Sequence, residues 1–375
     1  MGPRAAVTTV FFLNGASFSS WYSRLPAIQE RLDLGPGAVG LALLGAPLGL
    51  LIAQPSVGAV IARRGSRPLV AAAPIWLAAV ILPALAGNTL SLFAAVTLVG
   101  AANGALDIAM NAQGLAVERA AGQRLFSSLH AAFSFGALAG ASLAAVVAGL
   151  GVPPLAHLTG TAAIGAIAAL GVTGCLVSDQ PAEGQRGPRL ARPSRRLAIF
   201  GGIAFCVLLA EGAVFDWSAI YLAIDQQAAA GLAPIGLAAF SLTMGVGRLL
   251  ADPAADRFGE ASVARGGALA GAFGLGLALA TGSVGVSIAG FAVMGLGLAA
   301  VFPLTLRAAA QHPATAGPDL AAVSTFGYLG LFLGPPAIGI LAEATSLRAA
   351  LLLVCAACIL ATVFASRISG SRTES

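Results

Sequence analysis

The sequence predicts an all-α integral membrane protein with twelve transmembrane helices in two six-helix, pseudo-symmetric halves. Hydrophobic residues make up 58% of the 375-residue chain and charged residues only 9%, whereas a soluble domain carries roughly a quarter of its residues charged. A helix of about 20 apolar residues crosses the hydrocarbon core of a bilayer, and such runs follow one another along the chain. They lack the alternation of transmembrane β-strands.

Twelve apolar runs are separated by short polar or Gly/Pro-rich segments. A signal peptide is the alternative interpretation of the first run, because Arg4 precedes it. Its removal would leave eleven spans, and the run places polar residues on one side of a helix, so we interpret it as the first membrane helix. We expect helices near residues 5–24, 37–60, 69–87, 92–115, 127–150, 155–177, 198–222, 234–253, 262–281, 285–306, 320–342 and 347–366.

The arginines, which are the only basic residues apart from three histidines, indicate the orientation. With a cytoplasmic N-terminus, sixteen arginines fall in cytoplasmic segments, three (Arg24, Arg31 and Arg348) fall outside, and Arg248 lies within a span. The positive-inside rule therefore predicts a multi-pass membrane protein with both termini in the cytoplasm. The net charge of +5 is a topology signal and does not indicate nucleic-acid binding.

Features recur at a constant offset on either side of a polar segment. Residues 178–196 are rich in Pro, Gly and Arg, so we expect a cytoplasmic linker at 178–197 between an N-terminal half, 1–177, and a C-terminal half, 198–375. The motif ARRG at 62–65 returns 194 positions later as DRFG at 256–259. The packing glycines Gly136 and Gly140 match Gly330 and Gly334 at the same offset. Parallel repeats of this kind are typical of membrane transporters.

The turn after the second span resembles a motif of the major facilitator superfamily. That family carries Gly-x-x-x-Asp-Arg-x-Gly-Arg there, and this chain has Gly58, Arg63, Gly65 and Arg67, with Ala62 in place of the aspartate. Such glycines permit a tight turn and close helix approach. The resemblance implies that the motif holds the two halves in one conformation; the alternative is that these arginines only anchor the topology.

The second copy of the motif keeps the acidic residue. It reads Asp256, Arg257 and Gly259, with Asp252 in place of the first glycine, and Arg248 precedes it within the eighth span. The stretches WYSRLP (21–26), GALDIAMNAQGLAVE (104–118), LHAAFSFG (129–136) and EGAVFDWSAIYL (211–222) are similar to a bacterial inner-membrane group related to fucose:proton symporters. This resemblance implies a pathway lined by helices one, four, seven and ten, and an acidic residue on helix four that takes part in proton coupling.

Polar residues recur every fourth position on the fourth helix. Asn103, Asp107 and Asn111 form one stripe in an otherwise apolar segment. An ionisable side chain at this depth faces a cavity or a partner by default, and burial favours the neutral form of a carboxyl group. We therefore expect Asp107 to bind and release the coupled proton and the asparagines to bind substrate; the alternative is an Asp107 that only ties helices together.

Two further residues are candidates for proton coupling. Glu211, near the middle of the seventh helix, is a coupling or substrate-contact candidate or a structural hydrogen-bonding group. Asp216 points about 140° away from it, and we expect it near the outer interface, where a charge costs less. His130 begins the fifth helix and is a candidate for passing protons to Asp107, with an ordinary hydrogen-bonding role as the alternative.

The first helix carries candidates for the substrate cavity. Asn14, Ser17 and Trp21 lie on one side of it, and Trp21 could stack on a sugar ring or anchor the helix at the membrane interface. In the fifth helix Ala141 follows Gly140, so the Gly-x-x-x-Gly-Pro signature of drug:proton antiporters is absent. The eleventh helix instead has Gly334 followed by Pro335, which keeps an export function open.

These features predict a secondary transporter and no enzyme. The chain has no Walker loop and no nucleophile motif, and the CxxC pair Cys355 and Cys358 lies within the last apolar run, so we expect no cofactor and no metal. We expect a monomer that moves a small solute by alternating access, with protons and the lipid bilayer as its other partners. Proton-coupled symport of a polar or sugar-like solute is our main prediction; export of an amphipathic compound and a non-transporting sensor are the alternatives.

Overall fold

The computed structural model describes residues 1–123, 125–179, 194–311 and 315–368, and within them every regular element is a helix. The first half contains α1 (Pro3–Tyr22), α2 (Leu25–Arg31), α3 (Pro36–Leu43), α4 (Gly45–Arg64), α5 (Arg67–Ala71), α6 (Ala73–Ala78), α7 (Leu82–Leu85), α8 (Thr89–Ala121), α9 (Phe126–Gly149) and α10 (Pro154–Val172). The second contains α11 (Arg195–Ile220), α12 (Ile235–Phe258), α13 (Glu260–Ala280), α14 (Val284–Leu298), α15 (Val301–Ala309), α16 (Ala316–Ala344) and α17 (Leu347–Ala365). Most of the predicted linker lies outside the described residues.

Within the described residues, ten helical segments are long and apolar enough to cross a membrane. The 20-residue α1 and the broken segment from α5 to α7 occupy the first and third predicted runs, which is consistent with the twelve spans that the sequence predicts. The third predicted run, 69–87, is interrupted because prolines stand in the first turns of α5, α6 and α7. Proline has no backbone N–H to donate, so it begins helices and breaks the interior of one. The tenth predicted run is likewise divided into α14 and α15.

The two halves repeat one packing arrangement, in which the first helix of each half lies against the fifth. A Cβ atom on Gly136 of α9 would lie 2.0 Å from the carbonyl oxygen of Phe12 on α1. In the second half, a Cβ on Gly330 of α16 would lie 2.3 Å from the carbonyl oxygen of Phe205 on α11. Only glycine permits this approach. Gly136 and Gly330 therefore occupy equivalent packing positions. The second pair differs, because a Cβ on Gly140 would meet the Ala16 carbonyl oxygen at 2.1 Å and one on Gly334 only the Leu209 side chain at 3.7 Å.

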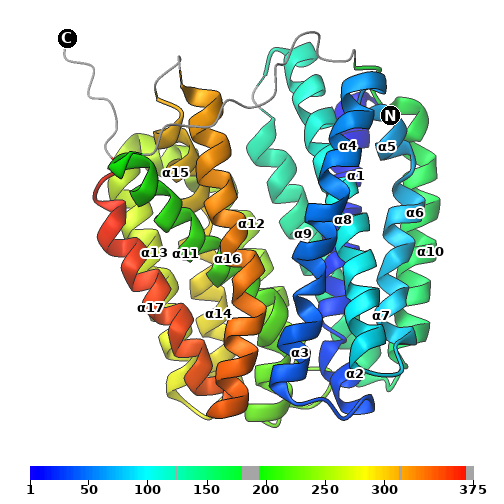
Figure 1. Ribbon diagram of the computed structural model, residues 1–375, viewed down its shortest axis with the longest axis vertical. Helices are drawn as coiled ribbons and strands as arrows, with labels where there is room; N and C mark the ends of the chain where they lie inside the picture. The colour runs from blue at the N-terminus through cyan, green and yellow to red at the C-terminus, as the bar shows by residue number, and fades with distance from the viewer. Residues whose placement is uncertain (124, 180–193, 312–314, 369–375) are drawn as a thin grey trace.

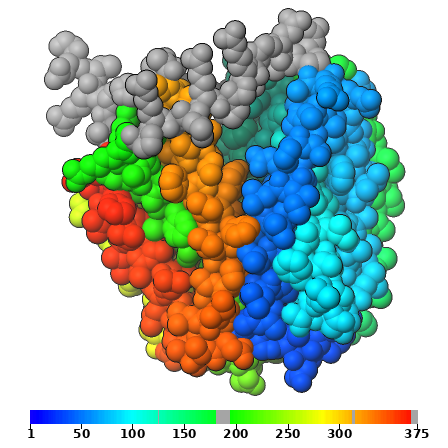
Figure 2. Space-filling model, in the orientation of Figure 1, coloured from blue at the N-terminus to red at the C-terminus, as the bar shows by residue number. Residues whose placement is uncertain are grey.

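The halves meet at one end of the bundle and separate at the other (Figures 1 and 2). We call the end that holds the start of α1 and the end of α17 the termini side. On the opposite side α3 packs on α16: a Cβ on Gly40 would lie 2.9 Å from the Cα of Gly339, and a Cβ on Gly339 would lie 2.8 Å from the Cα of Gly40. The contact between α9 and α12 also joins the halves.

A cavity of about 460 Å³ opens between the halves on the termini side. Its lining comes from both halves, namely Glu118 of α8, Phe126 and Ser127 of α9, Asp252 of α12 and Arg307 of α15. In Figure 2, the orange α16 and the blue first-half helices touch below and diverge above. The arrangement is therefore closed on the opposite side and open on the termini side.

The replacement Gly339→Leu should open the opposite side. The added side chain meets the backbone of α3, and overpacking of this kind costs about 1–3 kcal/mol, so the two halves should separate there. The measurement is labelling of an Ala42→Cys reporter on α3, which is 1% exposed, by a water-soluble thiol reagent on cysteine-free protein in nanodiscs. We expect labelling to rise on the order of tenfold.

The matched control is Gly276→Leu, since a Cβ at Gly276 meets nothing within 4 Å. Equal labelling of the Gly339→Leu and Gly276→Leu proteins would contradict the assignment of α3 and α16 as the closing contact.

Candidate substrate and coupling site

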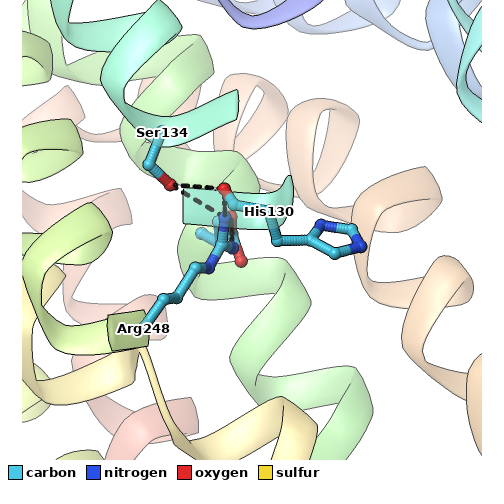
Figure 3. Close-up of polar contacts among 4 residues, drawn as sticks. His130, Ser134 and Arg248 are labelled. Carbon is cyan, nitrogen blue, oxygen red and sulfur yellow. Dashed lines mark hydrogen bonds and ion pairs between the residues drawn. The ribbon is translucent and has the colours of Figure 1, made fainter. Parts of the chain in front are cut away.

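An arginine from α12 joins the two halves within the membrane-spanning part of the bundle (Figure 3). The Arg248 guanidinium donates to Glu211 of α11 at 3.0 Å and to the Ser134 hydroxyl of α9 at 2.9 Å. It also donates to the His130 carbonyl oxygen at 3.3 Å. The Arg248 and Glu211 side chains are 16% and 19% exposed. Because a charge in the membrane needs a partner, the Glu211 carboxylate keeps Arg248 neutralised where it contacts the other half.

The His130 ring points away from this cluster, and only its backbone carbonyl takes part (Figure 3). The ring centroid lies 4.8 Å from that of Phe126 and 5.5 Å from that of Phe11. The imidazole is therefore packed between aromatic rings of its own half. A proton transfer from His130 to Asp107 stays a prediction, and it would need the ring to leave this packing.

Asp107 and Asn111 form a polar pair on α8. The Asn111 amide donates to the Asp107 backbone oxygen at 2.8 Å and to its carboxylate at 3.2 Å. The Asn111 side-chain oxygen is buried and has no hydrogen-bond partner. Tyr328 of α16 lies close enough across the interface for an electrostatic interaction with Asp107. None of the ion pairs among the described residues includes Asp107, so this half-buried acid has no cationic partner.

The remaining polar candidates face the interior of the first half. Asn14 and Ser17 of α1 and Asn103 of α8 line a pocket of about 10 Å³, together with Trp76 of α6. That volume is about the lower limit for one water molecule. Residue spacing predicts that Asn14 and Ser17 share one face of α1. Because α1 has neighbours on several sides, spacing alone does not identify the helix that this face contacts. In this conformation they do not border the space between the halves.

Trp21 is fully buried and its ring centroid lies 4.1 Å from that of Tyr22. It contacts neither solvent nor the lipid interface in this arrangement. The interpretations as an interfacial anchor and as a stacking platform for substrate both require an exposed ring. Trp217, which repeats Trp21 in the second half, is also fully buried.

The described contacts of the two arginine motifs are with the start of the linker and with the second half. In the first copy Gly65 has a positive φ of 74°, and the N–H groups of Ser66 and Arg67 donate to the Asp179 carboxylate. Asp179 thus supplies an acid near the position where Ala62 replaces the family aspartate. Arg63 and Gly58 are exposed, and a Cβ on Gly58 would meet no atom within 4 Å.

In the second copy of the motif, ion pairs join α12, α13 and α15. Arg307 donates to Asp252 and, at 3.4 Å, to Glu260. Gly259 ends α12 with a positive φ of 84°, while Asp256 and Arg257 are exposed. In this conformation none of the contacts described for the two motifs joins the first half to the second, and a role in holding the halves together stays a prediction.

Asp216 lies near the end of α11 but is buried. Spacing indicated a position near the interface, where a charge costs less, but the side chain is only 5% exposed. It faces Tyr22, the last residue of α1, which belongs to the other half. The sequence contains one indication of this contact. Tyr22 follows Trp21 and Asp216 precedes Trp217, and the repeat places these two tryptophans at equivalent positions of the two halves.

The described residues contain no group of three or more His, Cys, Asp and Glu side chains that could hold a metal. Cys355 and Cys358 lie within α17, where Cys358 is 1% exposed and packs in the core of the second half. The chemistry available at the site is therefore hydrogen bonding, charge pairing and proton binding.

Comparison with known proteins identifies the family. The chain is 33% identical over 95% of its length, and 92% of the relative's, to an uncharacterised MFS-type transporter of Yersinia pestis. This protein belongs to the major facilitator superfamily. The Major Facilitator Superfamily model itself matches residues 199–373.

Solved structures agree with the major facilitator fold. A variant of the nucleoside transporter NupG has a TM-score of 0.77 at 16% identity, covering 98% of this chain and 100% of that one. The Escherichia coli fucose:proton symporter FucP has a TM-score of 0.65 at 18% identity, covering 98% of this chain and 99% of that one. At these identities the likeness extends to the fold. The chain is a transporter, as the sequence predicts, and no enzyme.

The Glu211→Gln replacement should destabilise the protein more than Asp252→Asn does. It leaves Arg248 without a counter-charge at the interface, whereas the Asp252–Arg307 pair is 49% and 45% exposed, and exposed pairs contribute about 0–1 kcal/mol. The measurement is the thermal unfolding midpoint in detergent. A double-mutant cycle with Arg248→Gln should give a coupling energy of about 1–2 kcal/mol. Additive effects of the two replacements would show that the ion pair does not stabilise this arrangement.

Proposed function

We propose that this transporter moves a small, neutral, polar solute together with protons across the bacterial inner membrane. The observation that carries the proposal is Asp107, an acid in the middle of a membrane helix with no cationic partner among the described residues. An unpaired acid at this depth favours its neutral form and ionises when water reaches it. Such a group can bind a proton on one side and release it on the other.

The hydrogen-bonding groups near Asp107 favour an uncharged solute. Asn111 presents a buried oxygen without a partner, and Tyr328 lies across the interface with an exposed side chain. The Arg248 and Glu211 charges neutralise each other. A site of this composition offers hydrogen bonds and no net charge apart from the titrating acid, which suits a sugar or nucleoside better than an ion.

The distribution of arginines supports a cytoplasmic termini side. In that orientation the cavity beside Glu118 and Arg307 opens to the cytoplasm, and the contact between α3 and α16 closes the outer side. Transport would then follow from rocking of the two halves around Asp107, which gives each side access in turn. We propose that a monomer is sufficient, because the pathway lies within one chain.

Export of an amphipathic compound is the second proposal. It is favoured by Gly334 and Pro335 within α16, which repeat in the second half the pattern that antiporters of this family carry in the first. Both residues are buried, and Pro335 lies at the closing contact, where its carbonyl oxygen would meet a Cβ on Gly40 at 2.6 Å. A plain packing function explains this position equally well.

Replacing Asp107 with Asn should separate accumulation from exchange. The amide keeps a hydrogen bond to Asn111 but binds no proton, so a proton gradient should no longer drive solute uptake. The measurement compares gradient-driven uptake with solute exchange in proteoliposomes, using a panel of radiolabelled sugars and nucleosides. We expect accumulation to fall to the equilibrium level and exchange to continue within about threefold of wild type, a change of less than 1 kcal/mol.

Asp319→Asn is the control, since Asp319 lies in the first turn of α16 and bonds to Thr315 on its own half. Persistent accumulation by the Asp107→Asn protein would remove Asp107 from the coupling step.

A further inference from the structure

Asp216 is buried at the outer end of the contact between the halves. It lies near the end of α11, while its partner Tyr22 is the last residue of α1, and each side chain is 5% exposed. Aromatic rings surround the pair: the Tyr22 ring lies 4.8 Å from Phe18 and 6.1 Å from Phe215. Asp216 is the only acidic side chain among the described residues that reaches this degree of burial.

No cation among the described residues neutralises Asp216. The charged groups of this side are engaged elsewhere: Arg24 donates to the Val152 carbonyl, Arg31 to the carbonyls of Ala84 and Ala86, Arg348 interacts with Asp225, and Glu343 accepts from the Gly37 N–H. Tyr22 is the titratable group that faces Asp216, and its hydroxyl is an uncharged hydrogen-bonding partner. The surroundings of the carboxyl group are thus buried and aromatic, with no neutralising cation among the described residues.

Such surroundings accept a protonated carboxyl group and disfavour a carboxylate. A buried carboxylate without a cation or water is strongly unfavourable, whereas the neutral acid keeps its hydrogen bond to a tyrosine hydroxyl. When the halves separate on this side, α1 leaves α11 and water reaches Asp216. The open arrangement therefore tolerates both forms of the acid, and the closed arrangement only the neutral one.

We propose that Asp216 is a proton-dependent latch, in which a proton taken from the outer solution must bind Asp216 before the outer side can close against Tyr22. The inference rests on the proposed function, because it assumes alternating access with this side facing outward. In each closure the Asp216 carboxylate gains one proton from outer water, and on reopening it returns the proton there. Asp216 thus differs from Asp107, which would carry the transported proton, and it makes closure depend on outer pH.

The sign follows from proton linkage. The closed arrangement holds the proton more tightly than the open one, so the open one ionises first as pH rises and a higher pH favours opening. For a single group, the ratio of open to closed molecules changes by up to about tenfold per pH unit once the exposed acid ionises. The effect needs no solute.

The experiment measures the distance between the halves on the outer side as a function of pH. Spin labels at Leu90→Cys and Ala230→Cys, both exposed positions in different halves, are introduced into cysteine-free protein in nanodiscs and measured by double electron–electron resonance between pH 5 and 9. All proteins carry Asp107→Asn, so that this acid does not contribute. We expect the long-distance population to increase with pH when Asp216 is present.

Asp216→Asn should remove the pH dependence and leave the outer side closed, and Asp216→Glu should keep a dependence of the same sign. Tyr22→Phe keeps the ring but loses one hydrogen bond, so it should lower the closed population about two- to tenfold at acidic pH without abolishing the slope. The latch would be overturned if the long-distance population of the Asp216→Asn protein still increased with pH. It would also be overturned if the distance distribution never responded to pH when Asp216 is present. Continued solute accumulation by the protein that carries only Asp107→Asn would instead overturn the proposed function. It would leave the pH dependence of the distance between the halves unchanged.

Discussion

The cost of a charge in hydrocarbon is the constraint on which the arrangement of this protein depends. Even on the lenient insertion scale a charged residue at mid-membrane costs about 2.5–3.5 kcal/mol, and this chain accordingly has few of them. Those it retains lie where the halves meet. Arg248 contacts Glu211 in its own half and Ser134 in the other, Asp107 lies near Tyr328 of the other half, and Asp216 faces Tyr22. In the rocking mechanism that we propose, the interface that moves is therefore also where ionisable groups change their surroundings.

Glycine makes the close packing of the helices possible. Apolar helices gain little from association in lipid unless their backbones approach closely. Within each half, glycines fix the first helix against the fifth. Gly136 of α9 packs against α1, and Gly330 of α16 packs against α11. Between the halves, Gly40 and Gly339 let the backbones of α3 and α16 approach closely on the opposite side. We infer halves that are each fixed internally by such glycine contacts, which suits a rocking movement.

Much of the fold could be predicted from the sequence, because run length and repeat spacing are properties of the chain itself. Twelve spans and the equivalence of Gly136 and Gly330 follow from them. The site was less predictable, since the bond between Arg248 and Ser134 joins residues 114 positions apart. Spacing on α1 grouped Asn14 with Ser17 but could not identify the helices they meet. The orientation of the His130 ring and the burial of Asp216 depend on neighbours from distant segments.

In the mechanism that we propose, solute movement is coupled to protons through the acids between the halves. The most direct measurement is the internal pH of proteoliposomes that contain a trapped pH-sensitive dye and a potassium clamp on the membrane potential, after external addition of sugars and nucleosides. We expect a transported solute to acidify the interior, in proportion to the amount taken up. Alkalinisation on addition of solute, or uptake with no change in internal pH, would contradict symport and favour export or uncoupled transport.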